Sequence, residues 1–252
     1  MVRADPLTLD SIMLTILLLA CTPEAEKSAD TGFTEPVCEE LTPVSCEDAL
    51  FLDLGLQDDV SDGEISTISD GDDFVTSIDA TAGGYQVAAT NPWVYLKFTD
   101  SGAEKVEITD EEALESLDWD LSFRRFIIRL NGGSSGPSCV GAAVFMEDTY
   151  ESLTEVPDGL MYALDDYYTP DCSLINDSSG LPDNPQTALG PWWEYPGCVA
   201  TTGYPFLLQL ADGHTVKMVV ESYYEQGQDT CNSTGNMGSG SANFSIRWSF
   251  MP

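Results

Sequence analysis

Alternating apolar and polar residues run through most of the chain beyond about Thr76, and this pattern predicts β-strands. The clearest case is the segment 93–99, where Val94, Leu96 and Phe98 form a purely apolar face. A turn at 100–102 follows, and residues 105–108 alternate again. These segments therefore predict a β-hairpin.

Further strands are predicted along the rest of the chain. Residues 121–130 are rich in Phe and Ile and are expected to form one strand, and 140–146 a shorter one. Between them, 131–136 reads Asn-Gly-Gly-Ser-Ser-Gly, which is typical of a loop.

The last third of the chain contains the strongest turn signal. Asp212-Gly213 separates two apolar runs, 205–210 and 215–224, so we expect a hairpin with a type I′ turn, which needs positive φ at both central residues. Residues 243–250 form a final predicted strand, and 110–117 the best helix candidate. The sum is an antiparallel all-β domain, a sandwich or open barrel with little helix.

The N-terminus has the features of an export signal. An apolar stretch from Ile12 to Ala20 ends in Leu18-Leu19-Ala20-Cys21, which has the form of a lipobox. We expect residues 1–20 to be a lipoprotein signal peptide and Cys21 to receive the lipid; the alternative is an ordinary signal peptide in which Cys21 is incidental. The residue after the cysteine is Thr22 rather than Asp, which favours sorting to the outer membrane. The sequence does not indicate on which side of that membrane the protein lies.

Residues 21–73 are interpreted as an acidic tether and lead-in segment, and 74–252 as the all-β domain. The first part of this segment, 22–36, lacks apolar periodicity. The acids between Asp58 and Asp73 could suggest calcium, but an EF-hand that starts at Asp58 would have Val60 at its third position and Ser69 at its twelfth. A solvated acidic segment is the favoured interpretation.

The composition excludes several classes of partner. The chain has 252 residues, with 9 Lys and Arg against 43 Asp and Glu, a formal net charge of −34. Nucleic-acid binding and docking on anionic lipid both need clustered basic residues, so neither is expected. No apolar run is long enough for a transmembrane helix, so only the lipid anchor would attach the protein to a membrane.

Cysteine is the other unusual component. Besides Cys21 there are six cysteines, an even set that in an exported chain predicts three disulfides. The sequence leaves their pairing open, with Cys38–Cys46 as the favoured local pair. A zinc site is the alternative, but there is no CxxC and His214 is the only histidine. The six candidates are Cys38, Cys46, Cys139, Cys172, Cys198 and Cys231.

Catalytic constellations are weak. A Ser-His-Asp hydrolase would need His214, which directly follows the predicted turn and is expected to be exposed, and no G-x-S-x-G elbow occurs. Paired carboxylates for glycoside cleavage cannot be singled out from 43 acids. We therefore expect a protein that is not an enzyme.

Three arginines on one predicted strand form the more unusual feature. Strand alternation would place Arg125 and Arg129 on one face and Arg124 on the other. They could bind an anion, or pair with the surrounding acids, which is favoured. A set of aromatic residues could likewise line a flat ligand site, with Met146 or Met161 as a soft iron ligand, or pack in the core: Tyr162, Tyr167, Tyr168, Trp192, Trp193 and Tyr195.

Two blocks of sequence resemble the HmuY family of haem-binding surface lipoproteins. One is the stretch from Trp119 to Arg125, followed by that from Arg129 to Gly136. The other is Asp212-Gly213 with Lys217 and then Ser222-Tyr223-Tyr224, and Trp93-Val94-Tyr95 is similar to the opening strand of the family. We expect the stretches 119–136 and 212–224 to be neighbouring ribbons of one sheet that carries a recess for a ligand.

The resemblance implies an all-β fold on an outer-membrane lipid anchor. It also implies haem capture for a TonB-dependent uptake receptor, without catalysis. Family members hold haem iron through paired His or Met side chains; one histidine excludes a bis-His site here, and Met146 with Met161 is the conceivable pair. Arg124, Arg125 and Arg129 would contact the propionates. The alternative is that the same scaffold binds a glycan or a protein partner.

Overall fold

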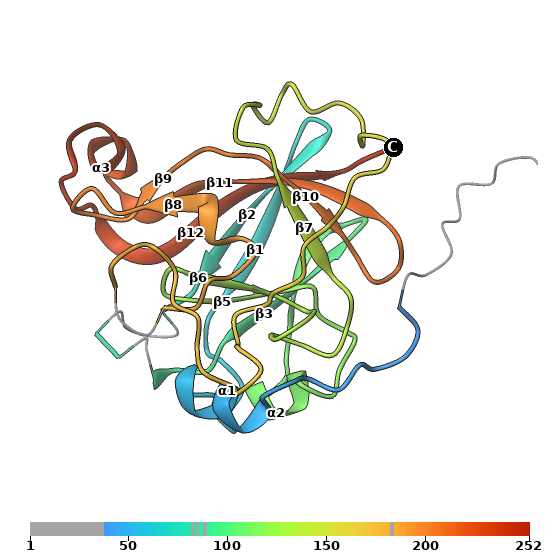
Figure 1. Ribbon diagram of the computed structural model, residues 1–252. Coiled ribbons are helices and arrows are strands. Elements are labelled where there is room, and N and C mark those ends of the chain that lie inside the picture. The colour runs from blue at the N-terminus through green and yellow to red at the C-terminus, as the bar shows by residue number, and fades with distance from the viewer. Residues whose placement is uncertain (1–37, 82–83, 85, 88–89, 182–183) are drawn as a thin grey trace, which may run out of the picture. The chain divides into compact units, whose positions relative to one another are not determined.

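Two antiparallel sheets form the body of the protein, as the computed structural model shows for residues 38–252 apart from 82–83, 85, 88–89 and 182–183 (Figure 1). The larger sheet has six strands in the order β1 (Ile65–Asp70), β2 (Asp73–Asp79), β12 (Ser239–Phe250), β11 (Thr215–Gln226), β10 (Phe206–Gln209) and β7 (Gly141–Val144). The smaller sheet has four, in the order β4 (Gly102–Val106), β3 (Val94–Thr99), β5 (Leu121–Arg124) and β6 (Ile127–Leu130). The predicted antiparallel all-β class with little helix is confirmed.

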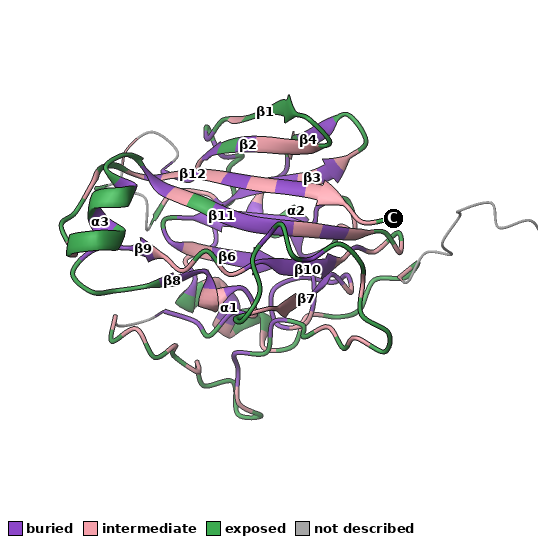
Figure 2. Ribbon diagram, turned by 90° about the horizontal axis from the view of Figure 1, so that it is seen from above, coloured by how far each residue is buried: buried purple, intermediate pink, exposed green. Residues whose placement is uncertain are grey.

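The main core lies between the two sheets. Phe123 of the smaller sheet meets Phe244 of the larger one at a ring distance of 5.3 Å, and Phe98 meets Trp248 at 4.7 Å. Side chains at alternate positions of both sheets join one buried apolar cluster, as strands that each present one face to a core require. Figure 2 shows the buried residues running along the central strands β10, β11 and β12.

The smaller sheet is buried on its second face as well. Helices α1 (Glu47–Asp53) and α2 (Asp110–Ala113) cover that face, and Leu50 of α1 packs in a second apolar cluster with Trp93 and Trp119. Helix α2 begins with a capping box, in which Thr109 accepts a hydrogen bond from the Glu112 N–H and the Glu112 carboxylate accepts one from Thr109 N–H. The predicted helix at 110–117 is therefore confirmed but shorter.

Both predicted hairpins form. Strands β3 and β4 pair from Tyr95–Val106 to Thr99–Gly102, and β10 pairs with β11 from Phe206–Met218 to Gln209–Thr215. The turn type predicted for the second hairpin is wrong. Gly213 has a φ of 87° and Asp212 has a negative φ, and Gly213 N–H donates to Leu210 C=O, so the turn is type I followed by a glycine bulge.

The prediction of one strand over 121–130 is also wrong. The chain reverses at Arg125, which has a φ of 53°, and Arg124 pairs with Ile127 across a two-residue connection. Arg129 therefore lies opposite Ser122, on the same face as Arg124, and not on the opposite face as strand alternation implied. No Gly, Asn or Pro marks this turn in the sequence.

The two stretches that carry the family resemblance do not lie in one sheet. Residues 121–130 form β5 and β6 of the smaller sheet, whereas 215–226 form β11 of the larger one. The expectation of neighbouring ribbons is therefore wrong; the two stretches face each other across the core instead. The ligand recess has to be sought elsewhere in the fold.

Three disulfides link distant parts of the chain: Cys38–Cys139, Cys46–Cys172 and Cys198–Cys231. The predicted set of three is confirmed, but the favoured pair Cys38–Cys46 is wrong. Cys46 is the N-cap residue of α1, and its partner lies 126 residues further along the chain. Contacts between segments far apart in sequence decide this pairing, so spacing did not reveal it.

The larger sheet begins earlier than the strand pattern suggested, because β1 starts at Ile65 within the acidic segment. Asp70 and Asp73 from this region bind Arg247 of β12, with N–O distances of 2.8 and 3.6 Å. Cys21 and the predicted signal peptide lie outside the described residues. Among the residues that are described, no helix has the length and apolar character needed to cross a membrane.

Candidate functional site

A cleft of about 680 Å³ lies among the loops between β7 and β9 (Ala200–Thr201). Its size falls in the range usual for small-molecule sites. Four segments line it: 163–166, 177–179, 186–191 and 193–195. The aromatic side chains of its wall are Trp193 and Tyr195, whose rings meet at 82° with centroids 6.4 Å apart.

The first wall segment extends the edge of the larger sheet. Ala163 exchanges backbone hydrogen bonds of 2.8 and 2.9 Å with Ala142 of β7. Asp165, fully inside, holds this segment in place: its carboxylate accepts hydrogen bonds from Leu130 N–H and Ala188 N–H, at 2.9 and 2.8 Å. Burial raises the pKa of Asp165, and these bonds oppose the rise. Asp165 thereby joins β6 to the second side of the cleft.

The aromatic wall is placed by a short 3₁₀ helix, η2 (Gly190–Trp192), and by β8 (Trp193–Glu194). Trp192 points into the core and donates from its indole N–H to Phe126 C=O at 3.2 Å. Trp193 then lies beside Phe126, with ring centroids 5.0 Å apart, and lines the cleft. Of these two consecutive tryptophans, Trp192 therefore packs in the core and Trp193 forms part of the cleft wall.

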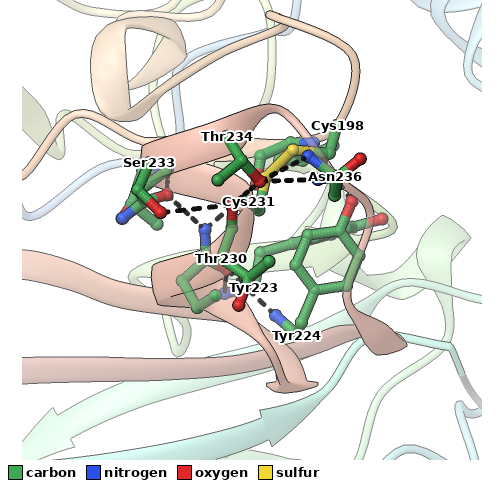
Figure 3. Close-up of a disulfide and its surroundings, with 12 residues drawn as sticks. Cys198, Tyr223, Tyr224, Thr230, Cys231, Ser233, Thr234 and Asn236 are labelled. Carbon is green, nitrogen blue, oxygen red and sulfur yellow. Dashed lines mark hydrogen bonds between the residues drawn. A yellow bond between two sulfur atoms is a disulfide. The ribbon is translucent and has the colours of Figure 1, made fainter.

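A disulfide supports the connection that follows the aromatic wall. Cys198 is joined to Cys231 of helix α3 (Gln228–Thr234), and Figure 3 shows this bond beside Tyr223 and Tyr224. The hydroxyl of Tyr224 accepts a hydrogen bond from Val199 N–H at 3.1 Å. The loop after β8 is therefore attached both covalently and through β11.

The charge of the cleft is negative. Its lining includes Asp166, Asp177 and Glu194, and no lysine or arginine is among the described residues that line it. Arg125 is connected to the cleft wall through one aromatic ring: its guanidinium carbon lies 5.0 Å from the centre of the Phe126 ring, which packs on Trp193. Arg125 is exposed, and it is the only lysine or arginine within the described part of the chain whose side chain makes no hydrogen bond or ion pair.

The other two arginines are structural. Arg124 donates to the carbonyls of Leu54 and Gly55 and so caps the C-terminal end of α1. Arg129 is fully buried and donates to Ser135 C=O at 2.6 Å. Within the described part of the chain neither arginine donates a hydrogen bond to a carboxylate, so the favoured interpretation, in which they pair with acids, does not hold for these hydrogen bonds.

The remaining predicted residues are spread over the surface and the core. Tyr167 and Trp192 are core residues, as the packing interpretation held. Met146 and Met161 are 55% and 86% exposed, and neither lines the cleft, although Met161 lies two residues before Ala163 of its wall. His214 is exposed as expected, with Nδ1 3.1 Å from the Asp212 carboxylate.

Most residues that line the cleft could not be predicted from the sequence. Its lining comes from a loop-rich stretch without periodicity, and only Trp193 and Tyr195 had been singled out. Asp165, which joins the two sides, looks like any of the 43 acids in the sequence. Its burial depends on the Asn131–Gly136 loop, where Ser135 Oγ donates to it at 2.6 Å.

Comparison with known proteins identifies the family. The family model described as HmuY protein matches residues 89–236. The chain belongs to the HmuY family. This match includes the cleft and both sequence blocks that suggested the resemblance. No curated protein matches the chain.

Three solved structures are similar to this HmuY-family chain. A HmuY-like haem-binding protein from Bacteroides vulgatus ATCC 8482 is 18% identical, with a TM-score of 0.45, over 73% of this chain and 97% of that one. The apo HmuY analogue of Tannerella forsythia is 17% identical, TM-score 0.44, over 77% and 100%. A lipoprotein from Bacteroides fragilis NCTC 9343 is 16% identical, TM-score 0.40, over 72% and 93%.

The family suggests haem, and the residues of the cleft fit it in part. A flat ring suits a wall made of Trp193 and Tyr195, and the volume is sufficient. The carboxylates of the lining would repel the two propionates. The cleft therefore fits a porphyrin only if the propionates point outward, toward a cation such as Arg125.

Proposed function

We propose that this protein binds haem in the cleft lined by Trp193 and Tyr195, without catalysing a reaction. The observation that supports this most is an aromatic-walled cleft of sufficient size within the matched HmuY region. Burial of a large apolar ring against these side chains would supply most of the affinity. The chain's own residues bind and orient the ligand, and the iron chemistry belongs to the haem.

Arg125 is the proposed contact for the propionates. A guanidinium forms paired hydrogen bonds with a carboxylate, and this one is exposed and makes no ion pair with any described residue. The sequence offered three arginines for this role, but Arg124 and Arg129 are used inside the fold. The proposal therefore rests on Arg125 alone.

Met146 and Met161 remain the proposed thioether ligands, although neither lines the cleft, so either side chain would have to turn toward the bound haem. The bridge between Ala142 and Ala163 lays the segment that carries Met161 alongside β7, the strand that leads to Met146. Both side chains are accessible, as ligands to an incoming iron have to be. A thioether stabilises ferrous more than ferric haem, so these residues are expected to act on the reduced form.

The cellular role follows from the same family. We propose that Cys21 carries a lipid, that the protein is held at the outer membrane, and that it passes haem to a TonB-dependent receptor. The second candidate function is binding of a glycan in the same cleft. The carboxylates, hydroxyls and amide that line the cleft together with Trp193 favour this alternative, because they suit a neutral polar ligand better than an anion.

The test is an absorption titration of the purified protein with ferric and ferrous haem, repeated with Met146→Leu and Met161→Leu. Haem binding predicts a shifted, saturable Soret band at micromolar concentration. Loss of the ferrous spectrum in either variant would support that methionine as a ligand. No spectral change in the wild-type protein rejects haem binding, and a glycan panel then tests the second candidate.

A further inference from the structure

Tyr195 occupies a distinctive position in the cleft wall. It directly follows β8, lines the cleft, and is 43% exposed, whereas its neighbour Trp193 is 8% exposed. The two rings meet edge to face. The Tyr195 side chain is close enough to Tyr223 and Tyr224 to interact with them electrostatically, but its hydroxyl makes no hydrogen bond to any residue that the structure describes, so this oxygen is not committed to another described side chain.

Few residues of this chain could ligate haem iron. The side chains that serve as axial ligands in proteins are those of His, Met, Cys and Tyr. The only histidine, His214, is held by Asp212 at a hairpin turn and does not line the cleft, and the six described cysteines are all in disulfides. Met146 and Met161 also lie outside the lining. Among the described residues that line the cleft, Tyr195 alone belongs to this set.

We propose that the phenolate oxygen of Tyr195 is an axial ligand to ferric haem bound in the cleft. The inference rests on the proposed function and names the ligand at that site. On binding, the phenol O–H bond breaks, its proton passes to water, and an oxygen–iron bond forms; the iron stays ferric. An anionic oxygen donor suits ferric iron, as a thioether suits ferrous iron, so Tyr195 and a methionine would act on different oxidation states.

The experiment compares Tyr195→Phe with Tyr204→Phe, a partly buried tyrosine outside the cleft. Each variant and the wild type are titrated with ferric haem and with metal-free protoporphyrin across a range of pH. Tyr195→Phe keeps the ring in the wall and removes only the oxygen. It should weaken ferric haem binding at least about ten-fold, since even outer-shell changes at metal sites cost that much.

Four further results are expected. Tyr195→Phe abolishes the phenolate-to-iron charge-transfer absorption and the release of one proton on haem binding. The same variant leaves the affinity for metal-free protoporphyrin unchanged. Tyr204→Phe behaves as the wild type in all of these measurements. An unchanged ferric spectrum in Tyr195→Phe overturns the ligand assignment while haem binding stands. Equal loss of haem and metal-free porphyrin also overturns it, because Tyr195 is then only a wall. A wild type that binds neither overturns the proposed function as well.

Discussion

Arg129 lies over Trp93 in the interior of the protein, with its guanidinium carbon 4.5 Å from the centre of the indole ring. The chain reversal at Arg125 causes this arrangement, because it places Arg129 on the face of the smaller sheet that carries Trp93 and is covered by α1 and α2. The buried carboxylates of Asp110 and Asp165 are close enough to interact electrostatically with this cation. Arg129 is thus a structural cation beneath the helical layer.

Replacing Arg129 with Met should destabilise the fold by about 3–5 kcal/mol, because it leaves buried carboxylates without their counter-charge. The exposed Arg125 is the matched control, and Arg125→Met should change the free energy of unfolding by no more than about 0.5 kcal/mol. Urea denaturation of the two variants measures this. Equal stabilities would contradict a structural role for Arg129.

Stability should depend on pH through Asp120. Burial raises the pKa of Asp120 to about 7 in the folded protein, although its carboxylate accepts a hydrogen bond from Phe98 N–H at 2.8 Å. The unfolded chain releases this proton near pH 4. Between these values the folded state binds more protons, so the free energy of unfolding falls as pH rises and levels off above pH 7, by at most about 1.4 kcal/mol per pH unit.

Asp120→Asn separates this contribution from other titrating groups. Asparagine can accept the same hydrogen bond and carries no titrating proton. Denaturation at several pH values between about 4 and 8 should show the variant gaining stability relative to wild type as pH rises. A constant difference across this range would mean that Asp120 does not titrate there.

The disulfide pattern can be mapped directly. Proteolysis without reduction should yield linked peptides for Cys38–Cys139, Cys46–Cys172 and Cys198–Cys231. Changing Cys46 and Cys172 together to Ser should cost about 2–5 kcal/mol of stability, because the bond closes a long loop. A peptide that links Cys38 to Cys46 would contradict the fold around α1.

Arg125 should tune haem affinity through charge. Arg125→Gln is expected to weaken haem binding by about three- to ten-fold and to reduce the dependence of haem affinity on salt. The reason is that an exposed charge at the edge of a site attracts a charged ligand through an interaction that salt screens. Lys97→Gln is the control, since Lys97 is partly exposed but already paired with Asp118 at 3.2 Å. If both variants bind haem equally, the propionates lie elsewhere.

Local pattern predicted the strands that face one core. Alternation located β3, and Asp212-Gly213 marked the hairpin of β10 and β11 even though the turn type was wrong. The local sequence pattern gave a wrong prediction where tertiary contacts determine the backbone conformation. Arg125 adopts a positive φ without any turn residue beside it, because the two short strands on either side gain pairing and burial.

The candidate site was less predictable than the fold. Trp193 and Tyr195 stood out by composition, but nothing in the sequence distinguished Trp193 from its core neighbour Trp192. The wall at 163–166 depends on a bridge to β7 and on buried Asp165, both of which are long-range contacts. Met146 and Met161 were chosen by chemistry alone, and their ligand role stays a prediction.

A crystal structure of the protein with haem shows directly whether the cleft binds the porphyrin. We expect electron density for the porphyrin against Trp193 in the cleft, with the propionates directed toward Arg125. Porphyrin density at any other surface, or an empty cleft in a crystal grown with saturating haem, would contradict this expectation.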